Sequence, residues 1–147
     1  MVITMKETDR HKPDYNIKSA AQMSGVTTNL IRAYERMGLI HPYRHPGNNY
    51  RLFTLDEVEW IARIKKLINE VGLNIEGIKC VLTIKPCWEE RDCPNSIREK
   101  CQAYRNYNHP CWHVKTELSC CPADECYKCS HYISSRQHPK LRYPKED

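Results

Sequence analysis

Eight cysteines gathered in one stretch constrain this chain more than any other feature. The 43 residues from Cys87 to Cys129 hold eight of the nine cysteines, a density well above the roughly 8–10% that marks a cross-linked scaffold. The large aliphatic residues of this stretch are only Ile97, Val114 and Leu118. So few apolar side chains cannot offset the conformational entropy of the chain. The stretch must therefore be cross-linked, bind a metal, or remain unfolded.

The chemistry of these thiols depends on the compartment. Residues 1–13 contain no apolar run of the length that a secretion signal needs, and no run of about 18 apolar residues would span a membrane. We therefore expect a cytoplasmic protein without a membrane partner, in which dense cysteine favours metal binding over disulfides. The formal net charge of +5 permits nucleic-acid binding without demonstrating it.

The first half of the chain has the pattern of two short helices joined by a turn. Residues 17–24 predict an Ala-rich helix that ends at Gly25. Thr27 or Thr28 would cap a second helix that runs to about Met37. Two short helices around a turn that contains glycine are typical of a helix-turn-helix.

The residues that follow predict a wing and a pair of helices. The turn-forming run Pro46–Asn49 lies between two β-prone pieces and indicates a two-stranded wing. Thr54 and Glu57 have the spacing of a capping box at the start of a helix that Gly72 would end. Asn74 would cap one more short helix. The predicted fold class is therefore mainly α: a winged helix-turn-helix followed by a small, irregular, metal-stabilised Cys-rich domain.

Three motifs within this region carry a family resemblance. They are LIRAYERMGLI (residues 30–40), YRLFTLDEVEWI (residues 50–61) and GLNIEGIKCVL (residues 72–82). With the order of the predicted elements, they make the segment resemble the DNA-binding domain of the MerR family of transcription regulators, most similar to its HspR and GlnR branches. The resemblance implies a homodimer on a pseudo-palindromic site in double-stranded promoter DNA, with RNA polymerase as a further partner.

The resemblance also places the DNA contacts on the second helix and the wing. The polar face of that helix would lie in a major groove, while the wing would meet phosphates. The spacing of Tyr34 on the apolar face favours a core position over a contact, although the residue is kept among the candidates. The candidate DNA-binding residues are Lys18, Thr28, Asn29, Arg32, Tyr34, Arg36, Arg44, Tyr50 and Arg51. The chain departs from the family at Ala33, where many members have tyrosine, and at Pro86, where many continue into a long dimerisation helix.

The second half carries paired Cys-Trp dipeptides at residues 87–88 and 111–112 and a closing Cys126-Tyr-Lys-Cys129 motif. It is similar to small Cys-rich modules common in anaerobic bacteria. Cys121, Cys126 and Cys129 have the spacing of a plant-type ferredoxin triplet. Four thiolates suit an iron–sulfur cluster or tetrahedral zinc, so we expect a 4Fe–4S cluster, with zinc as the alternative. The candidate ligands are Cys87, Cys93, Cys101, Cys111, Cys120, Cys121, Cys126 and Cys129. Cys80 is expected to be a small buried apolar residue.

Four segments result: a flexible N-terminal segment (1–14), the DNA-binding domain (15–86), the Cys-rich domain (87–133) and a flexible basic tail (134–147). We expect a DNA-binding transcription regulator whose Cys-ligated centre senses redox state or metal and modulates promoter binding. The alternatives are the same DNA-binding protein with purely structural zinc, and a metal-handling or electron-carrier module fused to a DNA-binding head. The sequence contains no residue pattern typical of an enzyme, so no catalytic residue is expected.

Overall fold

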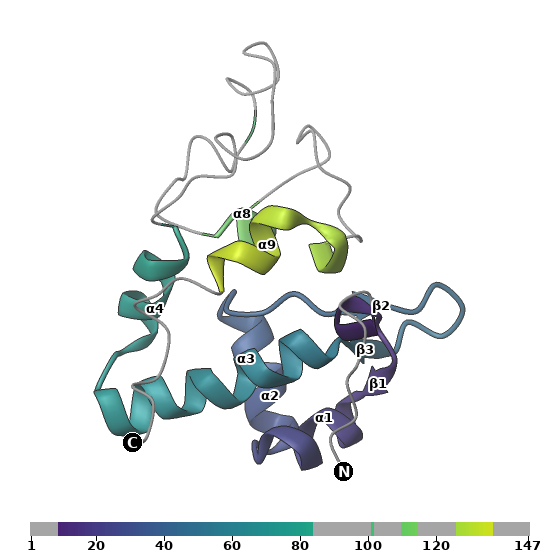
Figure 1. Cartoon of the computed structure of the whole chain (residues 1–147), viewed down its shortest axis with the longest axis horizontal. Coiled ribbons are helices and arrows are strands. Elements are labelled where there is room, and N and C mark those ends of the chain that lie inside the picture. The colour runs from purple at the N-terminus through teal and green to yellow at the C-terminus, as the bar shows by residue number, and fades with distance from the viewer. Residues whose placement is uncertain (1–8, 84–100, 102–109, 115–125, 137–147) are drawn as a thin grey trace.

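The computed structural model describes residues 9–83, 101, 110–114 and 126–136 (Figure 1). Its elements in chain order are η1 (Asp9–His11), β1 (Tyr15–Asn16), α1 (Ile17–Ser24), α2 (Thr28–Arg36), β2 (Tyr43–Arg44), β3 (Arg51–Phe53), α3 (Leu55–Lys66), the π-helical turn η2 (Leu67–Val71), α4 (Ile75–Leu82), α8 (Cys111–Val114), η3 (Cys126–Lys128) and α9 (Ser130–Ser135). Residues 9–83 are called the head below, and residues 110–114 with 126–136 the docked segment. No helix in the described part of the chain is long and apolar enough to cross a membrane.

The helix-turn-helix forms where its capping residues predict it. Gly25 ends α1 in the left-handed conformation, with φ of 73°. Thr27 then caps α2, because its hydroxyl oxygen accepts a hydrogen bond from the Leu30 amide at 3.2 Å. At the start of α1, the side chain of Asn16 accepts from the Ser19 amide at 2.8 Å, a cap that the sequence analysis missed. The predicted pair of helices is therefore confirmed.

The wing is confirmed and is larger than predicted. Strands β2 and β3 are antiparallel, with Tyr43 opposite Leu52 and Arg44 opposite Arg51. Strand β1 pairs with the other edge of β3, so the sheet has three strands in the order β1-β3-β2. Two residues before a helix are too short for a period-two pattern, which is why β1 was not predicted.

The two helices after the wing also begin and end as predicted. The hydroxyl oxygen of Thr54 accepts from the Glu57 amide at 3.0 Å at the start of α3. Gly72 ends η2 with φ of 85°, and the side chain of Asn74 caps α4 by accepting from the Gly77 amide at 2.7 Å. One prediction on α4 is wrong: the Cys80 side chain is exposed, because the helix turns Ile78 and Leu82 into the core instead.

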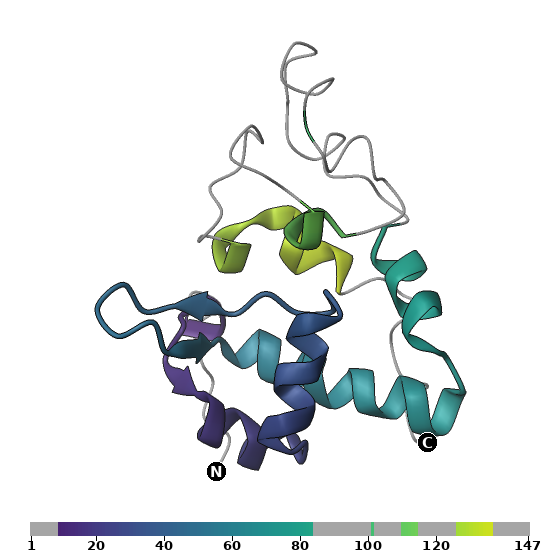
Figure 2. The same ribbon diagram turned by 180° about the vertical axis from the view of Figure 1, so that it is seen from behind.

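A single core joins the head to the docked segment. Helices α8 and α9 lie over the link between α2 and β2 in both views (Figures 1 and 2). Trp112, Cys126 and Tyr132 are buried in one cluster with the aliphatic residues of the head. The buried apolar residues of the head in this cluster are Ala20, Val26, Ile31, Tyr34, Leu39, Ile40, Phe53, Val58, Trp60, Ile61, Ile64, Leu67, Ile78 and Leu82. The docked segment therefore completes its core with side chains that the head supplies.

Two predicted segment limits are corrected. Residues 9–11 of the predicted flexible N-terminal segment form η1, which Arg10 ties to α3 through an ion pair with Glu59. Helix α9 extends to Ser135, and Arg136 is 2% exposed, although both residues were assigned to the flexible tail. The reason is that Arg136 forms a buried ion pair with Asp56. The predicted boundary between residues 86 and 87 lies outside the described residues.

Candidate nucleic-acid interface and docked cysteine segment

Helix α2 divides its side chains between the core and the outer surface. Ile31 and Tyr34 are buried, while Asn29 and Arg36 are exposed. Tyr34, at 2% exposure, was named as a candidate DNA contact, and its position in the core corrects that prediction. Its spacing of three residues from Ile31 places both on the inner face, and burial raises the pKa of its hydroxyl.

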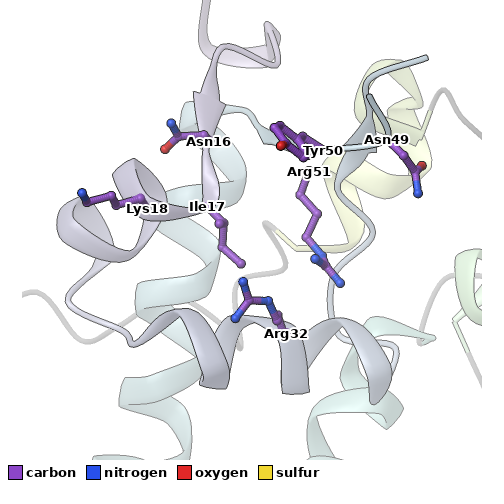
Figure 3. Close-up of a pocket in the computed structure, with 7 residues that line it drawn as sticks. All are labelled: Asn16, Ile17, Lys18, Arg32, Asn49, Tyr50 and Arg51. Atoms are coloured by element: carbon purple, nitrogen blue, oxygen red, sulfur yellow. The ribbon is translucent and has the colours of Figure 1, made fainter. Parts of the chain in front are cut away.

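A cationic hollow lies between this helix, the start of α1 and the wing (Figure 3). Its volume is about 420 Å³. Arg32 reaches into it from α2 and Arg51 from β3, while Lys18 is directed outward at its rim. The hollow is lined by Asn16, Ile17, Lys18, Arg32, Asn49, Tyr50 and Arg51. None of these lining residues is acidic, so the hollow suits an anionic ligand.

Glu35 fixes the wing to α2 through two ion pairs. Its Oε1 accepts from Nη2 of Arg44 at 2.8 Å and from Nε of Arg51 at 3.1 Å. Arg44 also donates to the backbone oxygen of Asn49 in the wing turn, at 3.3 Å. One carboxylate thus holds both wing arginines against α2, which sets the distance between this helix and the wing.

Some of the residues predicted to contact DNA line the hollow, and others do not. Lys18, Arg32, Tyr50 and Arg51 line it. The remaining exposed or half-exposed candidates lie outside its lining: Thr28 and Asn29 in the first turn of α2, Arg36 in its last turn, and Arg44 on β2. Sequence reasoning missed Asn16, Asn49 and Glu35. Asn16 was detectable, because asparagine before an Ala-rich helix is a cap signal, whereas the pairing of Glu35 depends on the fold.

Five cysteines lie in the described residues, and all carry thiols rather than disulfides. Cys101 and Cys126 are buried, and Cys111 and Cys129 are half-buried. Cys126 and Cys129 bracket η3, where the Cys129 amide donates to the Cys126 oxygen at 2.9 Å. This backbone hydrogen bond closes the turn between the two cysteines of the closing motif.

The thiols are soft donors suited to iron–sulfur clusters or zinc. Within the described ranges, no three His, Cys, Asp or Glu side chains group closely enough to hold a metal ion. The candidate ligands Cys87, Cys93, Cys120 and Cys121 lie outside those ranges. The described thiols alone therefore do not make a complete site, and the choice of ligands stays a prediction.

A buried polar network connects α9 to the head. The Tyr132 hydroxyl donates to the Glu57 carboxylate and accepts from the His41 amide at 2.7 Å. Burial raises the pKa of Glu57, which Arg136, Tyr132 and the His41 amide lower only in part. Burial, followed by the charge of Glu57, also holds the pKa of Tyr132 well above its ordinary value. The tyrosine therefore stays protonated and keeps its role as donor.

Arg136 adds an ion pair beside this network. Its Nη2 lies 2.7 Å from the Asp56 carboxylate, and its Cζ lies 4.0 Å from the centre of the Tyr132 ring. The backbone oxygen of Arg136 accepts from Arg63 at 3.1 Å. Asp56 is 7% exposed. Charged groups this deeply buried need partners, so α3 and the end of α9 depend on one another.

These features define a class of protein. A helix-turn-helix followed by a wing, with cations gathered between the second helix and the wing, is the architecture of a DNA-binding domain. Residues 15–83 match the family described as "MerR HTH family regulatory protein". These residues are thus similar to the helix-turn-helix domains of the MerR family, the resemblance that the sequence analysis drew from its motifs.

Several curated proteins are similar to this chain. The transcriptional repressor CarA of Myxococcus xanthus is 42% identical over 86 residues, which cover 57% of this chain and 29% of CarA. The putative heat shock protein HspR of Streptomyces coelicolor is 32% identical over 79 residues, 54% of this chain and 52% of HspR. The transcriptional regulator GlnR of Bacillus anthracis is 38% identical over 81 residues, 55% of this chain and 61% of GlnR.

The chain thus spans between about three-tenths and three-fifths of the length of these relatives. The family match ends at residue 83, so it does not extend to the cysteine-rich stretch. No solved structure matches the chain significantly.

Proposed function

We propose that this chain is a DNA-binding transcription regulator of the MerR type that binds a pseudo-palindromic promoter site as a homodimer. The observation that carries the proposal is the cationic hollow between α2 and the wing of a MerR-family domain. CarA and GlnR, which are similar to this chain, are named as transcriptional regulators. This chain's partner is then double-stranded DNA, with α2 in the major groove and the wing along the backbone.

The side chains of the hollow have separable roles in such a complex. Arg51, held by Glu35, presents a fixed charge to a phosphate. Arg32 donates to Asn29 at 3.3 Å on the outer face of α2, and either residue can reach a base edge from there. Tyr50 is 69% exposed at the wing, so its hydroxyl is accessible to a phosphate.

Substitution of Arg32 tests this proposal. Arg32→Ala should weaken binding about tenfold and reduce the slope of log Kd against log salt by about one, because one cation that neutralises the DNA backbone is lost. The probe is a DNA fragment isolated by binding selection, and fluorescence anisotropy at several salt concentrations measures the affinity. Arg10→Ala is the matched control, since Arg10 pairs with Glu59 outside the hollow. Equal effects of the two substitutions would refute the placement of the interface.

We further propose that the cysteine-rich stretch holds a metal centre, a 4Fe–4S cluster in preference to zinc, whose state modulates promoter binding. Cys126 and Cys129 stand at the start of the η3 turn and directly after it, and with Cys121 they would supply three thiolates. A fourth would come from another cysteine of the stretch. When bound, such a cluster supplies one-electron redox chemistry and sensitivity to oxidants.

Metal analysis of the anaerobically purified chain tests this centre. Iron with equimolar sulfide supports the cluster, whereas stoichiometric zinc in a colourless protein supports the structural alternative. Cys126→Ala and Cys129→Ala should each lose most of the metal. Cys80→Ala, which removes an exposed thiol of α4, should retain it. Metal content that is unchanged in either of the first two variants would remove that residue from the ligand set.

A further inference from the structure

The link between α2 and β2 is held by side chains that come from elsewhere in the chain. This junction, residues 38–42, joins the recognition helix to the first strand of the wing. The indole nitrogen of Trp112 donates to the Gly38 oxygen at 2.8 Å, and the indole nitrogen of Trp60 donates to the Leu39 oxygen at 3.0 Å. Two tryptophans, one from the docked segment and one from α3, thus bind adjacent carbonyl groups.

The Tyr132 hydroxyl is the third group that holds the junction. It accepts from the His41 amide at 2.7 Å and donates to Glu57 of α3. Its ring packs edge-on against Trp112, with ring centres 4.8 Å apart. A single hydroxyl from α9 therefore bridges the junction and α3, the long helix of the head. Its partners are a backbone amide and a buried carboxylate, both of which require a hydrogen-bond partner.

Gly38 lets α8 approach the junction closely. A Cβ atom at this position would lie 2.5 Å from Cγ of His113, and Gly38 has φ of 79°. Both the backbone conformation and the contact therefore require glycine here. The junction and α8 pack without space for a side chain between them, so a displacement of α8 is transmitted to the junction.

The residues that hold the junction adjoin the thiols. Trp112 follows Cys111 directly, and Cys129 forms the N-cap of the helix that carries Tyr132. The Ile133 amide donates to the Cys129 oxygen at 3.0 Å. The orientation of α9, and with it the position of the Tyr132 hydroxyl, follows the backbone of the closing Cys-x-x-Cys motif.

We infer that the two hydrogen bonds of the Tyr132 hydroxyl, to the His41 amide and to Glu57, transmit the state of the cysteine centre to α2 and the wing. This pair of hydrogen bonds is called the Tyr132 bridge. The inference rests on the proposed sensing function and names the positioning residues that carry it. Ligation of Cys126 and Cys129 sets the start of α9, and Tyr132 then fixes His41 against Glu57. When the centre is lost, the bridge opens and the junction is released. Helix α2 and the wing are then held by Glu35 and by the Trp60 hydrogen bond to Leu39, without the Tyr132 contact, so the spacing of Arg32 and Arg51 is less well defined.

The decisive variant is Tyr132→Phe, which keeps the ring against Trp112 and removes only the bridging hydroxyl. Kd for the selected DNA fragment is measured with the metal-loaded full chain and with the same chain emptied by a chelator, both anaerobically. In the wild type, emptying should change Kd about fivefold or more, within the usual range of coupling between two sites. In Tyr132→Phe the change should fall below about twofold, with metal content unchanged. Ser134→Ala, which removes an exposed hydroxyl from the same helix, should behave as the wild type.

Hydrogen exchange of the peptide that contains His41 gives a second readout, without DNA. Exchange in loaded Tyr132→Phe should match that in the emptied wild type, because both lack the bridge. Any of three results overturns the inference alone. Emptying changes Kd by the same factor in Tyr132→Phe as in Ser134→Ala, Tyr132→Phe loses its metal, or emptying leaves the exchange of this peptide in the wild type unchanged. A wild type whose Kd does not respond to emptying instead refutes the sensing function, and the inference falls with it.

Discussion

The head and the docked segment are built by opposite means. The head is organised by local signals: each helix starts at a capping side chain within three residues of its partner amide, and aliphatic side chains fill its interior. The docked segment has short helices of four and six residues. It is held by polar contacts that span 73–91 positions of the sequence. A region poor in apolar residues can thus be ordered when its tryptophan, tyrosine and arginine side chains pack against the core of a neighbouring region and hydrogen-bond to it.

The two buried tryptophans test whether the regions really share one core. Trp60 in the head and Trp112 in the docked segment are 1% and 5% exposed, and each donates to a junction carbonyl. Replacement of either by alanine should lower the free energy of unfolding by about 3–5 kcal/mol, because a large cavity forms. Urea denaturation of both variants measures this. A cost below about 1 kcal/mol for Trp112→Ala would show that the segment is not part of the core.

The buried ion pair of Arg136 gives the next largest effect. Arg136→Met removes the cation that pairs with the buried Asp56 carboxylate, and removal of one member of such a pair typically costs about 3 kcal/mol. The exposed pair of Arg10 and Glu59 within the head is the comparison, for which Arg10→Ala should cost less than about 1 kcal/mol. Thermal and urea unfolding measure both. A double variant, Asp56→Asn with Arg136→Met, should recover part of the lost free energy of unfolding. Equal costs for Arg136→Met and Arg10→Ala would contradict the expected difference between a buried and an exposed ion pair.

The smallest effect concerns pH. Burial raises the pKa of Glu57 above its ordinary value of 4.5, so the folded state binds the proton more tightly than the unfolded state does. The contribution of this group to the free energy of unfolding therefore falls as pH rises from 4.5 through the folded pKa. Glu57→Gln does not titrate, so its stability relative to the wild type should rise over the same interval. Urea unfolding of both proteins at a series of pH values measures this difference, and parallel curves would count against it.

The contrast between the regions also explains what the sequence could predict. The bounds of α1, α2, α3 and α4 followed from Gly25, Thr27, Thr54 and Asn74, because caps act within one turn of the chain. Lys18, Arg32, Tyr50 and Arg51 could be named as candidate contacts, since the family resemblance gives their helices and strands fixed positions. That the four converge on one hollow, however, is visible only in the fold.

Three errors have one physical origin. Tyr34 was included among the DNA contacts, Cys80 was expected to be buried, and Arg136 was assigned to a basic tail; in the structure, Tyr34 and Arg136 are buried and Cys80 is exposed. Each depends on which face of an element another part of the chain covers. An arginine among prolines and lysines has the composition of a solvated tail, and only the distant Asp56 reveals otherwise.

The Tyr132 bridge also has a consequence for the order in which the molecule is made. Glu57 precedes Tyr132 by 75 positions, so at about 5–20 residues per second its partner leaves the ribosome roughly 4–15 s later. During that interval the head can already form its locally capped helices, while Glu57 and the His41 amide still face water. Before the docked segment is made, the link between α2 and β2 therefore lacks its contacts with Trp112 and Tyr132 and keeps the one with Trp60. The head is thus completed by a segment that is synthesised after it.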